Sequence, residues 1–165
     1  MNQAVFLDRD GTLIVEKNYL HQPEEVEIFS GAGAALKKLA DAGFKLLVVT
    51  NQSGIGRGYF TMADAESVNA RVNQELARDG VHFEKTYIAP EAPDQPSCVR
   101  KPSPQFLFDA RDEFNLNLAE SFMVGDKLID LECAFQPHSR SINLSPTMKL
   151  SARFKLNSSR ASKRN

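Results

Sequence analysis

The feature that most constrains how this chain can fold is a regular alternation of short apolar runs with longer segments of helical spacing. The apolar runs lie at residues 3–8, 44–50, 85–90 and 121–126, with a weaker one at 141–145. The segments of helical spacing lie at residues 31–43, 61–80 and 102–114. Strands separated by helices of this length predict βαβ crossovers, and therefore a mostly parallel sheet between two layers of helices. The chain is thus expected to have an α/β fold.

The boundaries of these segments carry the usual signals. Residues 44–50, "FKLLVVT", form an apolar run of the kind found in a strand covered on both faces. The helix expected at 31–43 stops at Gly43, a common helix end. The helix expected at 61–80 has Thr61 as its N-cap and Gly80 as its stop.

Composition is that of an ordinary globular protein. Of the 165 residues, 42% are hydrophobic and 25% are charged, which suits one domain with a proper core. No apolar run approaches the ~18 residues of a membrane span, and no basic, leucine-rich leader precedes Ala4, so we expect no membrane partner. Cys98 and Cys133 are too few for a disulfide framework, which favours the reducing cytoplasm.

Charge is unevenly spread along the chain. Residues 133–165 contain seven Lys or Arg and no Asp or Glu, whereas residues 1–132 contain 13 Lys or Arg and all 21 Asp or Glu. A basic tail could contact nucleic acid or an acidic partner, but a solvated terminus carries the same charge. We expect a domain at residues 1–147, a loosely packed basic tail at 148–165, and no nucleic-acid partner. Because no exposed apolar stripe demands a partner, we expect a monomer.

Polar residues stand where the predicted strands end. Asp8 ends the first run, "TNQSG" (50–54) ends the second, "RKP" (100–102) follows the third and Asp126 ends the fourth. In a parallel sheet a ligand sits outside the carboxyl ends of the strands, so these groups are expected to converge at one edge. By itself "DRDG" (8–11) is also compatible with a strand that ends in a polar turn. The convergence of polar residues at four strand ends favours a functional site over a simple turn.

Acids in this arrangement fit magnesium-assisted transfer of a phosphoryl group. Neighbouring carboxylates repel each other unless a cation joins them, and Mg²⁺ takes oxygen ligands. Asp8 and Asp126 can supply carboxylates, and Asp10 its backbone carbonyl oxygen. Asp8 can then attack phosphorus to form an aspartyl-phosphate. Asp10, two residues on, can protonate the leaving oxygen and later take a proton from water.

The charge of the transferring phosphoryl group needs fixed donors and cations. Thr50 can supply its hydroxyl and nearby amides, and Lys101 can supply a compact positive charge. Asp130 lies four residues after Asp126, on the same side if a helical turn begins there. We expect Asp130 to orient Lys101 or the metal-bound waters.

The ordered set "DRDGT", "TNQSG", "RKP" and "GDKLID" resembles the haloacid dehalogenase-like phosphatases over roughly residues 3–135. The stretches "YLHQPEEVEIF" and "NQSGIGRGYF" resemble the branch of the family that acts on heptose bisphosphate. The resemblance implies a Rossmann-like, three-layer α/β/α fold with a minimal cap. It also implies Asp8 as nucleophile, Asp10 as general acid and base, and Mg²⁺ held by Asp8, Asp10 and Asp126.

The resemblance further implies side chains that stabilise the phosphoryl group or contact the rest of the substrate. These are Glu16, Lys17, Asn18, Tyr19, Thr50, Asn51, Gln52, Ser53, Arg100, Lys101 and Lys127. The expected substrate is a small phosphorylated sugar or amino alcohol, with the 7-phosphate of D-glycero-D-manno-heptose 1,7-bisphosphate as the first choice. The alternatives are histidinol-phosphate hydrolysis and, from a different class, a binding or regulatory module with little turnover.

Two regions depart from the family pattern. Many members carry zinc ligands just before "RKP", at positions that here read Ala89, Glu91, Ser97 and Val99. One remaining thiol, Cys98, cannot build a tetrahedral site, so we expect no zinc and a loop stiffened by its prolines. After Ala134 the family's helix and last strand lose their pattern, and Pro137 is expected to end the helix early.

Overall fold

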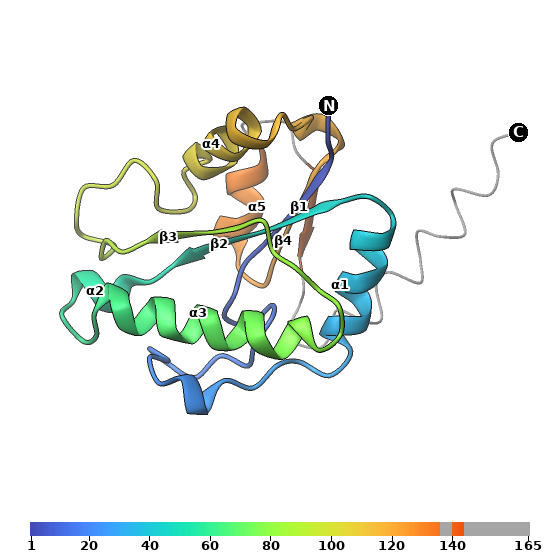
Figure 1. The fold of residues 1–165 in the computed structure, drawn as a ribbon. Helices are drawn as coiled ribbons and strands as arrows, with labels where there is room; N and C mark the ends of the chain where they lie inside the picture. Colours follow the sequence, from blue (N-terminus) through green and yellow to red (C-terminus); the bar gives the residue numbers. More distant parts are fainter. Residues whose placement is uncertain (136–139, 144–165) are drawn as a thin grey trace, which may run out of the picture.

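Five parallel strands form one sheet in the computed structural model, which describes residues 1–135 and 140–143 (Figure 1). The strands are β1 (Ala4–Leu7), β2 (Lys45–Asn51), β3 (Lys85–Ala89), β4 (Phe122–Gly125) and β5 (Arg140–Asn143). The helices are α1 (Ala32–Asp41), α2 (Ser53–Gly56), α3 (Met62–Ala77), α4 (Gln105–Phe114) and α5 (Leu128–Phe135). Two short 3-10 turns, η1 (Pro23–Glu25) and η2 (Leu118–Glu120), complete the elements. The expected α/β fold with a parallel sheet is confirmed.

The order of the strands across the sheet is β3-β2-β1-β4-β5. β1 therefore lies between β2 and β4, with Leu7 paired to Val48 on one side and to Val124 on the other. The chain builds outward from β1 in one direction through β2 and β3, then returns to add β4 and β5 on the other side. Such a reversal opens a crevice at the carboxyl ends of the two strands that flank it, here β1 and β4.

Helices cover both faces of the sheet, because successive strand residues point to opposite sides. On one face Val5 and Leu7 of β1 pack in a core with Leu36 of α1 and Val72 of α3. On the other face Phe6 of β1 packs in a second core, to which α4 and α5 contribute Leu107, Ala110, Cys133 and Ala134. Figure 1 shows α1 and α3 below the sheet and α4 and α5 above it. The three layers are those expected.

The element boundaries agree with the sequence signals to within a few residues. Thr61 caps α3: its hydroxyl accepts from the backbone N–H of Asp64, and the Asp64 carboxylate accepts from the backbone N–H of Thr61. α4 begins at Gln105, three residues later than expected, after Pro104 at its N-cap. The short helix α2 was not expected from the sequence.

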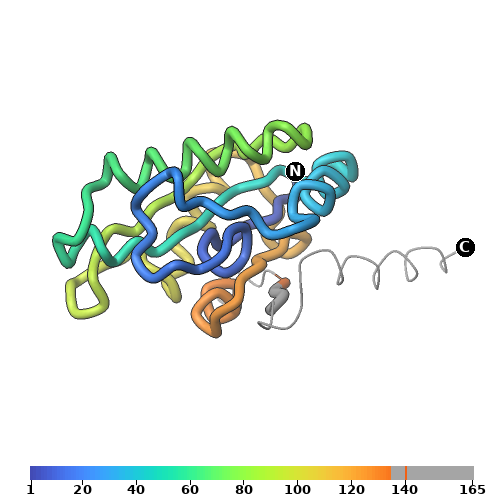
Figure 2. The backbone as a smooth tube through the Cα atoms, turned by 90° about the horizontal axis from the view of Figure 1, so that it is seen from below, coloured from blue at the N-terminus to red at the C-terminus, as the bar shows by residue number. Residues whose placement is uncertain are grey.

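The segment between β1 and α1 folds back beneath the sheet instead of forming a second domain (Figure 2). Ile14 forms an isolated bridge with Ile28, and the turn η1 packs against α3. Leu13, Ile14 and Leu20 are buried in the first core, which anchors the segment beside the carboxyl end of β1. This is the minimal cap expected from the resemblance.

The predicted basic tail, residues 148–165, lies outside the described residues, as do Pro137 and the last two positions of the strand expected at 141–145. Among residues 1–135 and 140–143, no helix combines the length and the apolar character that crossing a membrane requires. Both cysteines are free thiols, Cys98 exposed and Cys133 buried.

Candidate active site

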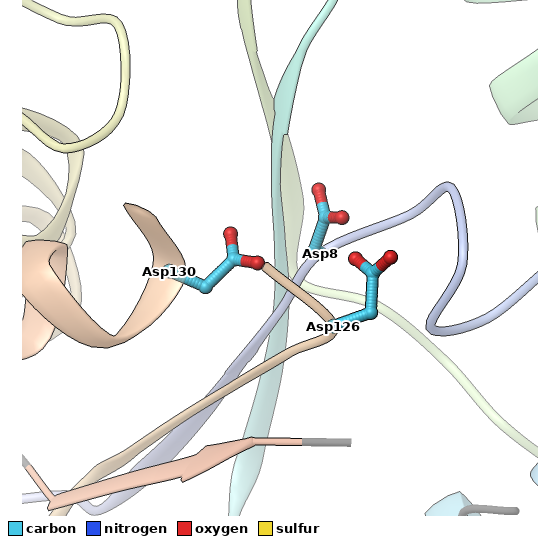
Figure 3. Close-up of side chains that lie close together, drawn as sticks. All are labelled: Asp8, Asp126 and Asp130. Carbon is cyan, nitrogen blue, oxygen red and sulfur yellow. The ribbon is translucent and has the colours of Figure 1, made fainter. Parts of the chain in front are cut away.

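Three carboxylates gather where β1 and β4 end. Asp8 follows β1, Asp126 follows β4, and Asp130 stands in the first turn of α5. One oxygen from each residue lies within 4.8 Å of the oxygens of the other two. Figure 3 shows the three carboxylates close together beyond the strand ends. We call Asp8, Asp126 and Asp130 the acid cluster.

Lys101 supplies a cation to this cluster. Its Nζ lies 2.7 Å from Asp8 Oδ1 and 2.7 Å from Asp130 Oδ1, and it donates to the backbone oxygen of Val49 at 2.8 Å. Burial alone would lower the pKa of Lys101, but the Asp8 and Asp130 carboxylates outweigh it and raise the pKa above its ordinary value. Asn51 fixes the backbone of Lys101 by accepting from its N–H at 3.0 Å and donating to its carbonyl at 3.1 Å.

Asp126 has no such partner. Its Oδ1 is buried and accepts no hydrogen bond from the part of the chain that the structure describes. Burial and the neighbouring Asp8 carboxylate raise the pKa of Asp126 to about 6. A buried carboxylate oxygen without a donor, beside a second carboxylate, is an arrangement that a divalent cation stabilises. The donor set therefore fits Mg²⁺.

Two glycines allow the acid cluster to form. Gly11 has a φ of +82°, and a Cβ at this position would lie 2.4 Å from Asp126 Oδ2. A Cβ on Gly125 would lie 2.2 Å from Asp130 Cγ. The sharp turn after β1 and the close approach of α5 to β4 both require the absence of a side chain.

Asp10 is held by a different set of groups. Its Oδ2 accepts from Arg9 Nε at 3.0 Å and from Gln52 Nε2 at 2.9 Å. Burial raises the pKa of Asp10; Arg9 opposes this shift, and the Asp8 carboxylate adds to it. Gln52 Nε2 also donates to Thr50 Oγ1 at 2.8 Å. The Asp10 carboxylate is not part of the acid cluster, and a contribution of its backbone oxygen to a metal site stays a prediction.

A cleft of about 310 Å³ opens over these groups. Eleven of the residues singled out in the sequence line it: Asp8, Asp10, Glu16, Asn18, Tyr19, Asn51, Gln52, Ser53, Lys101, Lys127 and Asp130. At its mouth Lys127 Nζ lies 3.1 Å from Glu16 Oε2, and both side chains are about half exposed. We call Glu16 and Lys127 the rim.

Four predicted residues do not line the cleft. Thr50 and Asp126 lie beside it, Thr50 buried and bonded to Gln52. Lys17 turns away and donates to the backbone oxygen of Glu25 at 2.7 Å. Arg100 donates to the backbone oxygen of Glu91 at 2.9 Å. Their proposed contacts with substrate stay predictions.

The loop between β3 and α4, where the resemblance would place zinc ligands, is held by hydrogen bonds to its backbone. Ser97 Oγ accepts from the N–H groups of Val99 and Arg100, at 3.2 Å and 3.0 Å. Gln95 Oε1 accepts from the N–H of Ala92 at 2.8 Å. These bonds order the loop through its own side chains.

Sequence reasoning missed several residues at the site. Leu20, Gly54, Phe60 and Ile129 line the cleft. Phe60 belongs to the stretch "GRGYF", which was noted only as part of the family pattern. Arg9 is the second residue of "DRDG" and was given no role, and Asn69 of α3 carries no sequence signal of its own. Both prove to be bonded into the site.

Comparison with known proteins gives consistent matches. A family model described as haloacid dehalogenase-like hydrolase matches residues 16–136. A Helicobacter pylori D-glycero-beta-D-manno-heptose-1,7-bisphosphate 7-phosphatase is 39% identical over 131 residues, which are 79% of this chain and 76% of the relative. The Escherichia coli K12 protein of the same name is 41% identical over 138 residues, covering 79% of this chain and 72% of the relative.

A solved structure supports the fold. The D,D-heptose 1,7-bisphosphate phosphatase from B. bronchiseptica, complexed with magnesium and phosphate, superposes with a TM-score of 0.83. The match covers 96% of this chain and 99% of that one, at 24% identity. At this identity the similarity is one of architecture.

Proposed function

Since the chain belongs to the haloacid dehalogenase-like hydrolases, we propose that it is a magnesium-dependent phosphomonoesterase that removes the 7-phosphate of D-glycero-D-manno-heptose 1,7-bisphosphate. The names of the bacterial relatives at about 40% identity support the substrate. The observation that carries the chemistry is the acid cluster with Lys101 buried between two of its members.

The proposed metal site includes Asp126, whose buried Oδ1 accepts no hydrogen bond from the described part of the chain. Asp8 and Asp126 would hold Mg²⁺ through their carboxylates, and Asp10 through its backbone oxygen. When bound, Mg²⁺ would neutralise part of the charge of the phosphoryl group. Asp130 pairs with Lys101 at 2.7 Å and accepts from the backbone N–H of Lys127 at 3.0 Å, so its role would be to orient Lys101.

The reaction would proceed in two steps on this chain's own residues. A carboxylate oxygen of Asp8 attacks phosphorus, the bond from phosphorus to the sugar oxygen breaks, and Asp10 gives its proton to that oxygen. Asp10 then accepts a proton from water as the water attacks the aspartyl-phosphate, which frees Asp8 and releases phosphate. Lys101 and Thr50 would stabilise the charge on the equatorial oxygens.

The rest of the substrate would meet the mouth of the cleft. Lys127 is the exposed cation closest to the acid cluster in sequence, next to Asp126, and it lines the cleft with Asn18, Tyr19 and Ser53. Amide, hydroxyl and phenol groups of this kind suit the hydroxyls of a sugar. We place this activity in a domain of residues 1–147.

The test is turnover of the bisphosphate followed by ³¹P NMR. We expect the purified protein, stripped with a chelator and given Mg²⁺ alone, to remove the 7-phosphate signal and leave the anomeric phosphate. Asp8→Asn should abolish the reaction, whereas Asp94→Asn, a matched change in the exposed loop after β3, should leave it intact. Activity that survives Asp8→Asn would contradict the aspartyl-phosphate scheme.

Two parallel measurements separate the alternatives. Histidinol phosphate assayed side by side should be turned over much more slowly, and equal slow rates on both substrates would contradict the proposed substrate. Elemental analysis of the purified protein should find no stoichiometric zinc. A zinc ion retained at one per chain would contradict the expectation of no zinc.

A further inference from the structure

Arg9 is a charged side chain that is almost fully removed from water. It stands between Asp8 and Asp10 in the sequence, and it is 1% exposed. A buried charge is costly unless it is paired and hydrogen-bonded. Within the described part of the chain the guanidinium has two partners, the Asp10 carboxylate and the side-chain oxygen of Asn69.

The contact with Asp10 has two points. Arg9 Nε donates to Asp10 Oδ2 at 3.0 Å, and Arg9 Nη2 donates to Asp10 Oδ1 at 3.2 Å. A planar guanidinium that meets both oxygens fixes the plane of a carboxylate as well as its position. Gln52 adds a third donor to Oδ2. Three donors therefore hold the Asp10 carboxylate, which lines the cleft.

The far end of the guanidinium is held by a helix remote in sequence. Arg9 Nη1 donates to Asn69 Oδ1 at 2.9 Å, across 60 positions of the chain. Asn69 is 7% exposed and lies on α3 beside Val68 and Val72, which are buried in the core. Packing of α3 on the sheet thus fixes where this oxygen stands.

We propose that Asn69 is a positioning residue for catalysis: it fixes the Arg9 guanidinium, and through it the orientation of the Asp10 carboxylate toward the leaving group. The proposal rests on the proposed function, in which Asp10 is the general acid. Without the Asn69 oxygen, Nη1 loses its partner and the guanidinium can turn, so Asp10 loses its fixed plane.

Substrates with different leaving groups can show whether Asn69 affects the general acid. A sugar oxygen leaves poorly unless it is protonated, whereas nitrophenolate leaves without a proton, so only the first reaction needs the general acid. General acid catalysis contributes about 10²–10⁴ in rate. The ratio kcat/KM covers the steps up to phosphorylation of Asp8, so loss of Asp10's later action as a base does not enter it.

The experiment compares kcat/KM for heptose 1,7-bisphosphate and for p-nitrophenyl phosphate in full-length variants. Asn69→Leu should lower kcat/KM about 10-fold for the sugar phosphate and less than about 3-fold for the aryl phosphate. Asn73→Leu, an exposed asparagine one turn further along α3, should change neither. Asn69→Ala serves as the second variant if Asn69→Leu is recovered unfolded.

A double-mutant cycle shows whether Asn69 acts through Asp10. In an Asp10→Asn background, Asn69→Leu should cause no further loss on the sugar phosphate, because the group that it positions is gone. Two outcomes would overturn the proposal, because each would mean that Asn69 has a merely structural role. One is a further loss of kcat/KM when Asn69→Leu is added to Asp10→Asn; the other is an equal loss of kcat/KM on both substrates for Asn69→Leu alone. If Asp10→Asn by itself lowers kcat/KM equally for both substrates, then Asp10 is not the general acid and that part of the proposed function is wrong instead.

Discussion

The bottom of the cleft and its rim are both built from ion pairs, but their surroundings differ. At the bottom, which we call the floor (Asp8, Lys101 and Asp130), the side chains are 7%, 1% and 1% exposed. At the rim the Lys127 and Glu16 side chains are 52% and 45% exposed. Similar charges thus stand at similar distances, 2.7 Å and 3.1 Å, in water-poor and water-rich surroundings.

This contrast in exposure separates a part of the site that should tolerate few changes from a part that can vary. A surface ion pair contributes about 0–1 kcal/mol, because water and salt screen it. Removing one partner of a buried pair costs about 3–5 kcal/mol, because it leaves a charge without compensation. The floor should therefore fix the chemistry for every substrate, whereas the rim should adjust which substrate is preferred.

Among the changes that test this comparison, the largest effect is expected from Lys101→Met in the floor. It should lower kcat/KM by about 10²–10³ for any phosphomonoester, since a fixed cation is lost. It should also lower the free energy of unfolding by about 3–5 kcal/mol. Steady-state kinetics and urea denaturation measure both. The control is Lys85→Met, which breaks the exposed pair with Glu113. If the Lys101→Met protein had the same free energy of unfolding as this control, the proposed difference between buried and exposed pairs would be wrong.

A smaller and more selective effect is expected from Lys127→Met at the rim. KM for the heptose bisphosphate should rise several-fold, while kcat/KM for p-nitrophenyl phosphate stays within about 2-fold. Unfolding free energy should change by less than about 1 kcal/mol, because the pair with Glu16 is exposed. An equal loss of kcat/KM on both substrates would mean that Lys127 acts on every substrate, as the floor does, and would contradict the proposed difference between rim and floor.

The smallest effect on the cleft is expected from Thr61→Ala, which lies in neither region. Loss of the capping box with Asp64 should lower the free energy of unfolding by about 1 kcal/mol. The kinetics on both substrates should stay unchanged, because the first turn of α3 lies two turns before Asn69. A drop in kcat/KM would show that the start of α3 already influences the site.

The fold could be predicted from local pattern alone. Runs such as 44–50 have no helical alternative at their length, and the intervening helices require parallel strands. The boundaries moved by up to three residues, as at the start of α4, because the point at which a helix begins or ends depends on what its terminal turn packs against. The helix α2 was missed because four residues with two glycines show no periodicity.

The candidate site was predicted in part. Asp8, Lys101 and Asp126 were expected to converge because the carboxyl ends of parallel strands meet at one edge, and the structure brings them together. The substrate contacts expected of Lys17 and Arg100 stay predictions: in the structure these side chains donate to the backbone oxygens of Glu25 and Glu91. Their direction depends on the paths of loops, which residue types do not specify.

Local patterns in the sequence were enough to predict the order of strands and helices along the chain, the polar residues at the strand ends and, through them, the family of the protein. Each of these depends on neighbours within a few positions of the chain. The structure alone reveals that Asn69 meets Arg9 across 60 positions and that Asn51 holds the backbone of Lys101 across 50 positions. Contacts of this kind arise from how a whole helix or loop packs on the sheet, and packing sums many weak interactions that no short motif contains.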